Sequence, residues 1–71
     1  MKDRRDLIYD LIFSEKTVYS IDISEYIKDI YRYDEFVSEI KAVLRKSKVT
    51  ILKSSVMVDS KTATWELKVK K

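Results

Sequence analysis

The sequence predicts an α+β chain with three helices, one short strand and a C-terminal β-hairpin. Apolar residues recur with helical spacing in three segments of the first two thirds of the chain. The last third changes to alternation of apolar and polar residues, which is typical of half-buried strands. The chain has 71 residues, which is enough for one domain, so we assign residues 1–71 to a single unit.

The first predicted helix runs from Asp3 to Phe13. Four apolar side chains share one stripe at i, i+1, i+4 and i+5, namely Leu7, Ile8, Leu11 and Ile12. Asp3 can cap the helix, because a short acidic side chain accepts hydrogen bonds from the first free backbone N–H groups. Tyr9 and Phe13 fall on the opposite side of this helix, so they are candidates for contact with a partner.

The next two elements are a strand and a helix. Residues 16–21 are mainly β-branched or aromatic and predict a brief strand. Asp22 and Glu25 then have the spacing of a capping box, which predicts that a helix starts there. Apolar residues follow at i, i+3, i+4, i+7 and i+8, namely Ile23, Tyr26, Ile27, Ile30 and Tyr31.

A third helix is predicted from Asp34 to about Lys46, with Asp34 as its cap. Its apolar face consists of Phe36, Val37, Ile40, Val43 and Leu44. Beyond it, a hairpin with Ser60 and Lys61 at its tip brings two apolar rows into one register. The predicted pairs are Val58 with Ala63, Val56 with Trp65, Ser54 with Leu67, and Leu52 with Val69.

The order of these elements resembles the winged helix-turn-helix superfamily over nearly the whole chain. ISEYIKDI looks like the first helix of the pair, DEFVSEIKAVLRKSK like the recognition helix, and VTILKSSVMVDSKTATWELKV like the wing. Two positions depart from the usual pattern. Ile27 stands where a small Ala is frequent, and the turn around Arg32 lacks the frequent Gly. The resemblance implies a DNA-binding domain whose third helix enters the major groove.

Four absent residue types exclude several kinds of chemistry. The chain has no Gly, Pro, Cys or His. Glycine-rich phosphate loops, zinc fingers, and thiol or imidazole catalysis are therefore excluded, and we expect no metal and no cofactor. The paired acids are explained by capping or lie on predicted solvent faces, so we expect no enzyme and no small-molecule substrate. Cysteine absence fits a cytoplasmic chain, and no apolar run is long enough to span a membrane.

Charge is distributed unevenly along the chain. Residues 14–40 carry three basic and seven acidic side chains, whereas residues 41–71 carry nine basic and two acidic ones. Such asymmetry indicates a polyanionic partner. We expect double-stranded DNA and a role in transcription regulation. The predicted DNA-binding residues lie on the third helix and the hairpin, namely Ser38, Lys41, Arg45, Lys46, Lys48, Lys53 and Lys61.

Tyr9 and Phe13 allow two interpretations, one within the DNA-binding hypothesis and one that belongs to a different class of function. Tyr9 and Phe13 could form the interface of a homodimer, which would suit a small DNA binder that reads paired half-sites. Alternatively, the chain is a protein-interaction module, an inhibitor or adaptor, that contacts its partner through the first helix. The abundance of Ile, Lys, Tyr, Asp and Ser is what AT-rich coding produces, which suggests a virus, a plasmid or a thermophile as the source.

Overall fold

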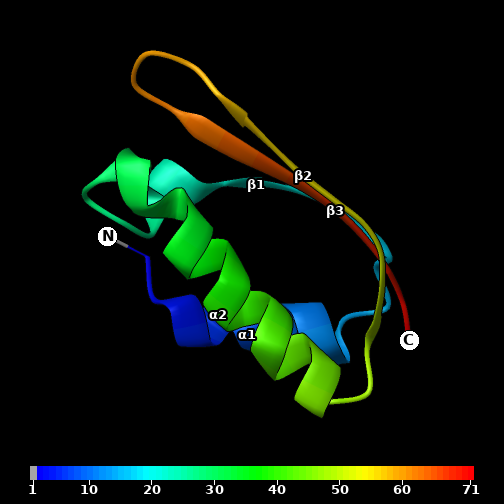
Figure 1. The fold of residues 1–71 in the computed structure, drawn as a ribbon. Helices are drawn as coiled ribbons and strands as arrows, with labels where there is room; N and C mark the ends of the chain where they lie inside the picture. Colours follow the sequence, from blue (N-terminus) through cyan, green and yellow to red (C-terminus); the bar gives the residue numbers. More distant parts are fainter. Residues whose placement is uncertain (1) are drawn as a thin grey trace.

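Two helices lie on one face of a three-stranded antiparallel sheet in the computed structural model, which describes residues 2–71 (Figure 1). The helices are α1 (Arg4–Phe13) and α2 (Tyr33–Lys46). The strands are β1 (Val18–Asp22), β2 (Thr50–Val58) and β3 (Ala63–Lys70), in the order β1-β3-β2. Two short 3₁₀ turns, η1 (Ile23–Glu25) and η2 (Ile30–Arg32), connect β1 to α2.

The central strand β3 organises the hydrophobic core. Its alternate side chains are buried under the helices, namely Ala63, Trp65, Leu67 and Val69. Trp65 is fully buried, and Phe36 of α2 meets its ring edge-on at a centroid distance of 6.4 Å. The intervening residues of β3 face away from the helices, so the other face of the sheet is open to solvent.

The hairpin has the predicted register over its outer part. Val58 pairs with Ala63, Val56 with Trp65, and Ser54 with Leu67. The prediction fails beyond Ser54, because the ladder shifts between Ile51 and Lys53 and Val69 pairs with Ile51. Leu52 occupies the resulting bulge and is 55% exposed, whereas Ile51 packs against the core.

The predicted winged-helix architecture, with three helices and a C-terminal hairpin, is wrong. The structure has two α-helices, and the segment predicted as the second helix is the irregular stretch that holds η1 and η2. The hairpin is part of a three-stranded sheet, since β1 pairs with β3 along its whole length, from Val18–Lys68 to Asp22–Thr64. The short strand predicted at residues 16–21 therefore forms one edge of the sheet as β1.

Local hydrogen bonds explain why the middle segment is not a helix. Asp22 accepts from the backbone N–H of Ser24, and Asp29 accepts from that of Tyr31, so each acid starts its own tight turn. Glu25 does not close the predicted capping box, because its carboxylate pairs with Lys2 at 2.5 Å. The β-branched and aromatic residues of this segment also favour a helix only weakly, so the local turns prevail.

The two helices differ in how they begin. Asp3 caps α1 as predicted, since its side chain accepts from the backbone N–H of Arg5 at 2.8 Å. Helix α2 begins at Tyr33 rather than at Asp34, and its N-cap Arg32 makes no side-chain capping bond. Over residues 2–71, no helix has the length and apolar character required to cross a membrane.

Replacing Ser54 by Ala will test whether the hydrogen bond between Ser54 and Trp65 stabilises the packing of the hairpin on the core. The Trp65 indole N–H donates to Ser54 Oγ at 2.9 Å, and Trp65 is fully buried. Loss of the acceptor leaves a buried donor unpaired, so we expect the free energy of unfolding to fall by about 1–3 kcal/mol in urea denaturation. Ser55→Ala is the matched control, because the exposed Ser55 lies opposite Glu66 on the open face. An equal loss in both variants would contradict this account.

Candidate nucleic-acid interface

Helix α2 is divided along its length by charge. Its buried stripe of Phe36, Val37, Ile40 and Leu44 packs on the core. The first half of its exposed surface carries acids, namely Asp34, Glu35 and Glu39. The second half carries Lys41, Arg45 and Lys46, and the last two lie in the final turn, where cations interact favourably with the helix dipole. The second half of α2 is therefore the half whose exposed charges attract a polyanion.

The end of α2 is closed by a Schellman motif. The backbone N–H of Val49 donates to the carbonyl of Leu44 at 2.9 Å, and that of Lys48 donates to Arg45 at 3.1 Å. Val49 and Leu44 are both buried, which adds the apolar contact that accompanies this motif. Lys48 adopts the left-handed conformation at φ 63°, a position that normally favours Gly.

An open basic hollow lies between the second half of α2 and the first half of β2. Its volume is about 710 Å³, and its lining is Lys41, Arg45, Lys48, Val49, Thr50, Ile51, Leu52, Lys53 and Ser54. Among these described residues four are basic and none is acidic. The Schellman turn creates the hollow, because it reverses the chain and places β2 beside the helix surface that carries Lys41 and Arg45.

Further lysines lie beside the basic hollow on the open face of the sheet. Lys53 of β2 pairs across the ladder with Lys68 of β3, and Thr50 pairs with Lys70. Like charges directly opposite each other destabilise a sheet, so the Lys53–Lys68 pair has a cost in the free protein. Lys68 and Lys70 are absent from the predicted site, although the predicted hairpin register, extended to the outward positions, would have placed them near Lys53.

Within the part of the chain that the structure describes, the basic side chains of this region have no acidic partner within ion-pair distance. The four ion pairs found within residues 2–71 all join residues of the first 39 positions: Lys2–Glu25, Arg4–Glu39, Arg5–Asp3 and Arg32–Glu35. The acids of the first half of the chain are thus partly neutralised, whereas no ion pair among residues 2–71 offsets the positive charge of the basic hollow.

The structure brings together four of the seven predicted DNA-binding residues. Lys41, Arg45, Lys48 and Lys53 all line the basic hollow. Ser38 and Lys46 are exposed on α2 but do not line it. Lys61 lies in the hairpin tip beyond Val58, and the strand β2 between that tip and the basic hollow is itself about 26 Å long from Thr50 to Val58 (Figure 1). The tip and the C-terminal end of α2 therefore lie at opposite ends of the molecule.

The two predicted partner-interface residues lie on the exposed surface of α1. Tyr9 and Phe13 are each 67% exposed, and their rings contact each other at a centroid distance of 4.7 Å. Neither residue lines the basic hollow. They form a separate surface feature, as the helical spacing predicted.

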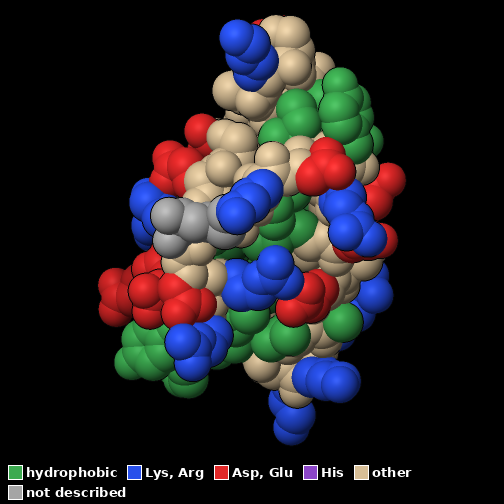
Figure 2. Space-filling model, turned by 90° about the vertical axis from the view of Figure 1, so that its left-hand side faces the viewer, with side chains coloured by type: hydrophobic (Ala, Val, Ile, Leu, Met, Phe, Trp, Pro, Cys, Tyr) green, Lys and Arg blue, Asp and Glu red, His purple; other side chains and the backbone are tan. Residues whose placement is uncertain are grey.

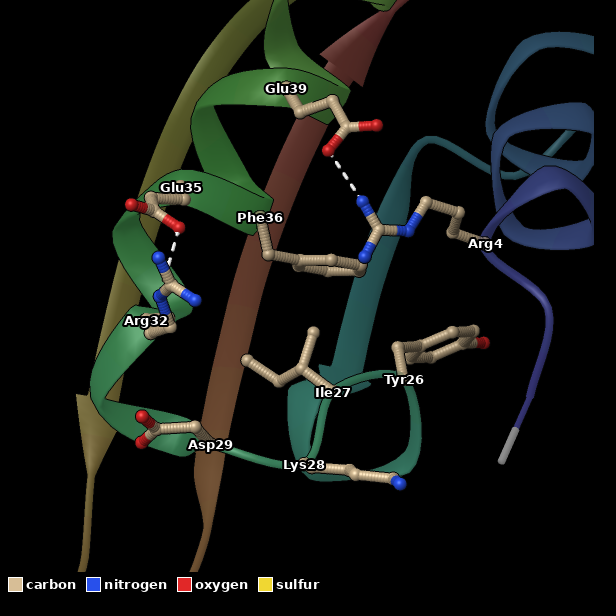
Figure 3. Close-up of a pocket in the computed structure, with 9 residues that line it drawn as sticks. All are labelled: Arg4, Tyr26, Ile27, Lys28, Asp29, Arg32, Glu35, Phe36 and Glu39. Carbon is tan, nitrogen blue, oxygen red and sulfur yellow. Dashed lines mark hydrogen bonds and ion pairs between the residues drawn. The ribbon is translucent and has the colours of Figure 1, made fainter.

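A second hollow, of about 440 Å³, lies at the other end of α2 (Figure 3). Tyr26, Ile27 and Phe36 give it an apolar floor, and burial raises the pKa of Tyr26. Its charged lining is three basic and three acidic residues, namely Arg4, Lys28, Arg32, Asp29, Glu35 and Glu39.

Four of the six charged residues that line this second hollow are joined in ion pairs. Arg4 lies over the Phe36 ring at 5.4 Å and pairs with Glu39, while Arg32 pairs with Glu35 at 3.2 Å. Figure 2 shows acidic and basic side chains intermixed over the side of the molecule that is on the left in Figure 1. A lining of balanced charge does not select a polyanion, so the basic hollow is the better candidate for the interface. Sequence reasoning missed this second hollow because it assigned residues 23–31 to a helix.

Comparison of the chain with protein-family models, with curated proteins and with solved structures found no match. The interpretation of the site therefore depends on its own residues and geometry. Within residues 2–71 no group of three or more His, Cys, Asp or Glu side chains is placed to hold a metal ion.

Two substitutions of Lys48 will distinguish the energetic cost of its left-handed backbone conformation from the effect of its charge on stability. Lys48→Gly relieves the unfavourable left-handed conformation, so we expect the free energy of unfolding to rise by about 1 kcal/mol in urea denaturation. Lys48→Ala removes the same charge without relieving the backbone, and we expect its stability to stay within about 0.5 kcal/mol of the native chain. Equal stability of the Gly and Ala variants would refute a strained conformation at this position.

Proposed function

We propose that this protein binds double-stranded DNA through the basic hollow and the adjoining second half of α2. The observation that carries the proposal is the convergence of Lys41, Arg45, Lys48 and Lys53 on one concave surface whose described lining has no acid. Phosphate groups are the natural partners of such a surface, because each contact neutralises a charge and releases counterions from the DNA. Lys68 and Lys70 extend the positive charge onto the open sheet face.

A duplex suits this surface better than a single strand does. Proteins that hold single-stranded nucleic acid combine basic grooves with exposed aromatic rings, on which successive bases stack. The described lining of the basic hollow contains no aromatic residue. The side chains that project from the open sheet face beside it, such as Lys53, Lys68 and Ser55, are not aromatic either. Contact with the phosphate backbone of a duplex needs no stacking platform.

The charge division of α2 sets the direction of approach. Asp34 would be repelled by phosphates, and Glu35 and Glu39 are held in ion pairs with Arg32 and Arg4. The first half of the helix therefore offers phosphates no net attraction, and the helix presents its C-terminal half to the DNA. Arg45 is exposed there and has the planar fork that binds either a phosphate or a guanine edge in the major groove. Lys41 and Lys48 lie within about one helical turn of it and would contact the flanking backbone.

A titration of duplex DNA at several salt concentrations tests this function. Neutralisation of four phosphates gives a slope of log affinity against log salt of about −3.6. Arg45→Gln should make that slope shallower by about 0.9 and weaken binding about tenfold at moderate salt, since one charge-assisted hydrogen bond contributes roughly 1.5 kcal/mol.

Lys61→Gln is the matched control, because Lys61 lies at the hairpin tip, outside the described lining of the basic hollow. Its affinity and its salt slope should equal those of the native chain. The absence of binding at low salt, or equal losses in the Arg45 and Lys61 variants, would refute the proposal. Tighter binding to duplex RNA of the same sequence would assign the surface to RNA instead of DNA.

The predicted role in transcription regulation stays a prediction, since DNA contact by itself does not specify a process. A protein partner at α1 is the second candidate function. It is favoured by the exposed contact between Tyr9 and Phe13. Large exposed aromatic groups that lie together indicate a contact surface.

A further inference from the structure

The exposed side of α1 carries a regular ridge. Arg5, Tyr9 and Phe13 follow one another at intervals of four residues and are all exposed. Side chains at i, i+4 and i+8 form the row that most often packs against a second helix in globular proteins. We call these three residues the α1 ridge. Ile8 and Ile12 lie beside it and are half-buried against the core, so apolar surface continues from the ridge to the body of the protein.

The α1 ridge is complementary to itself when two copies run antiparallel. A two-fold axis at Tyr9 places the two Tyr9 rings against each other. It also places Arg5 of each copy opposite Phe13 of the other, because residues 5 and 13 are equally distant from residue 9. When the helices cross at about 50°, the most common packing angle, two rows of this kind run parallel and each lies in the groove beside the other, so Tyr9 packs next to Tyr9 and Arg5 next to Phe13. The ridge therefore offers an isologous interface, in which each copy supplies both halves of the same contact.

The chemistry of the paired residues favours this arrangement. A guanidinium group stacks favourably on an aromatic face, so both ends of the interface gain an Arg5–Phe13 contact. Arg5 can keep its ion pair with Asp3, at 2.9 Å, because the carboxylate holds the edge of the guanidinium and leaves its faces free. The side-chain hydrogen bond to Asp3 raises the pKa of Arg5, whose guanidinium group is in any case always charged in proteins. A parallel arrangement would instead place the two Arg5 charges together.

We infer that the partner of the α1 ridge is a second copy of this chain, which forms a two-fold dimer with antiparallel α1 helices. The inference is independent of the DNA-binding proposal, since no residue of α1 is among the lining residues of the basic hollow. The interface is limited to one helix of ten residues, so the dissociation constant should lie on the order of 10–100 µM.

Sedimentation equilibrium measures this dimer directly. The native chain should change from monomer to dimer as its concentration rises through this range. Tyr9→Lys places two positive charges at the two-fold axis, and this variant should stay monomeric. Tyr9 is exposed, so the variant should keep the circular dichroism spectrum and melting temperature of the native chain. Tyr31→Lys is the control, because Tyr31 is 83% exposed on η2, outside α1, and its variant should dimerise normally.

Disulfide trapping tests the geometry, because the chain contains no cysteine of its own. Tyr9→Cys places two thiols at the axis, close enough for a bond that requires Cα atoms within about 7 Å, so oxidation should give a covalent dimer. Met57→Cys, at a 64% exposed position on β2, should give far less.

A native chain that stays monomeric up to about 1 mM would overturn the dimer. Equal dimerisation of the native and Tyr9→Lys chains, or equal cross-linking of the two cysteine variants, would also overturn it. DNA titration of Tyr9→Lys distinguishes the two proposals. If the Tyr9→Lys variant is monomeric and still binds DNA, both proposals are supported. If the native chain forms the dimer but does not bind DNA, the DNA-binding proposal is refuted and the dimer is not.

Discussion

Burial of Trp65 is the interaction on which the rest of the structure depends. Its ring fills the centre of the core between β3 and α2, and its indole N–H donates to Ser54 Oγ of the neighbouring strand. In a strand, a shift by one residue would turn Trp65 to solvent and Glu66 into the core, so this one side chain fixes which face of the sheet is buried. The same register places Lys53, Lys68 and Lys70 on the open face, which makes the position of the outer charges a consequence of core packing.

Alternation in the sequence was enough to predict this part of the fold. The apolar row from Ala63 to Val69 has one register with β2 that buries it, and the structure has that register except at the bulge of Leu52. The middle segment was predicted incorrectly because its apolar spacing fits a helix, whereas its stability depends on hydrogen bonds of Asp22 and Asp29 with backbone two residues ahead. The spacing of apolar residues does not reveal that these side-chain hydrogen bonds compete with helix formation. Without the second helix, the predicted winged-helix architecture is wrong.

The candidate site could be predicted only in part for a related reason. Lys41, Arg45, Lys48 and Lys53 lie close together in sequence, so a turn after α2 was sufficient to bring them to one hollow. Lys61 is as basic as they are, but the length of β2 places it at the other end of the molecule. Whether the hairpin tip folds back towards a helix depends on the direction in which the strands leave that helix, and the charge pattern contains no information about this direction.

The absence of glycine links stability to the proposed function at one residue. A helix that ends in a Schellman motif needs a left-handed residue, and in this chain Lys48 takes that position at φ 63°. A glycine at this position would adopt the left-handed conformation at lower energetic cost, but it would remove one of the four basic side chains of the hollow. Natural proteins commonly retain such local costs at sites that serve function. The unfavourable backbone of Lys48 and the uncompensated pair of Lys53 and Lys68 lie in the same region, and the second cost would be relieved by a bound phosphate. Both local costs therefore lie where the structure gathers four basic side chains around one hollow.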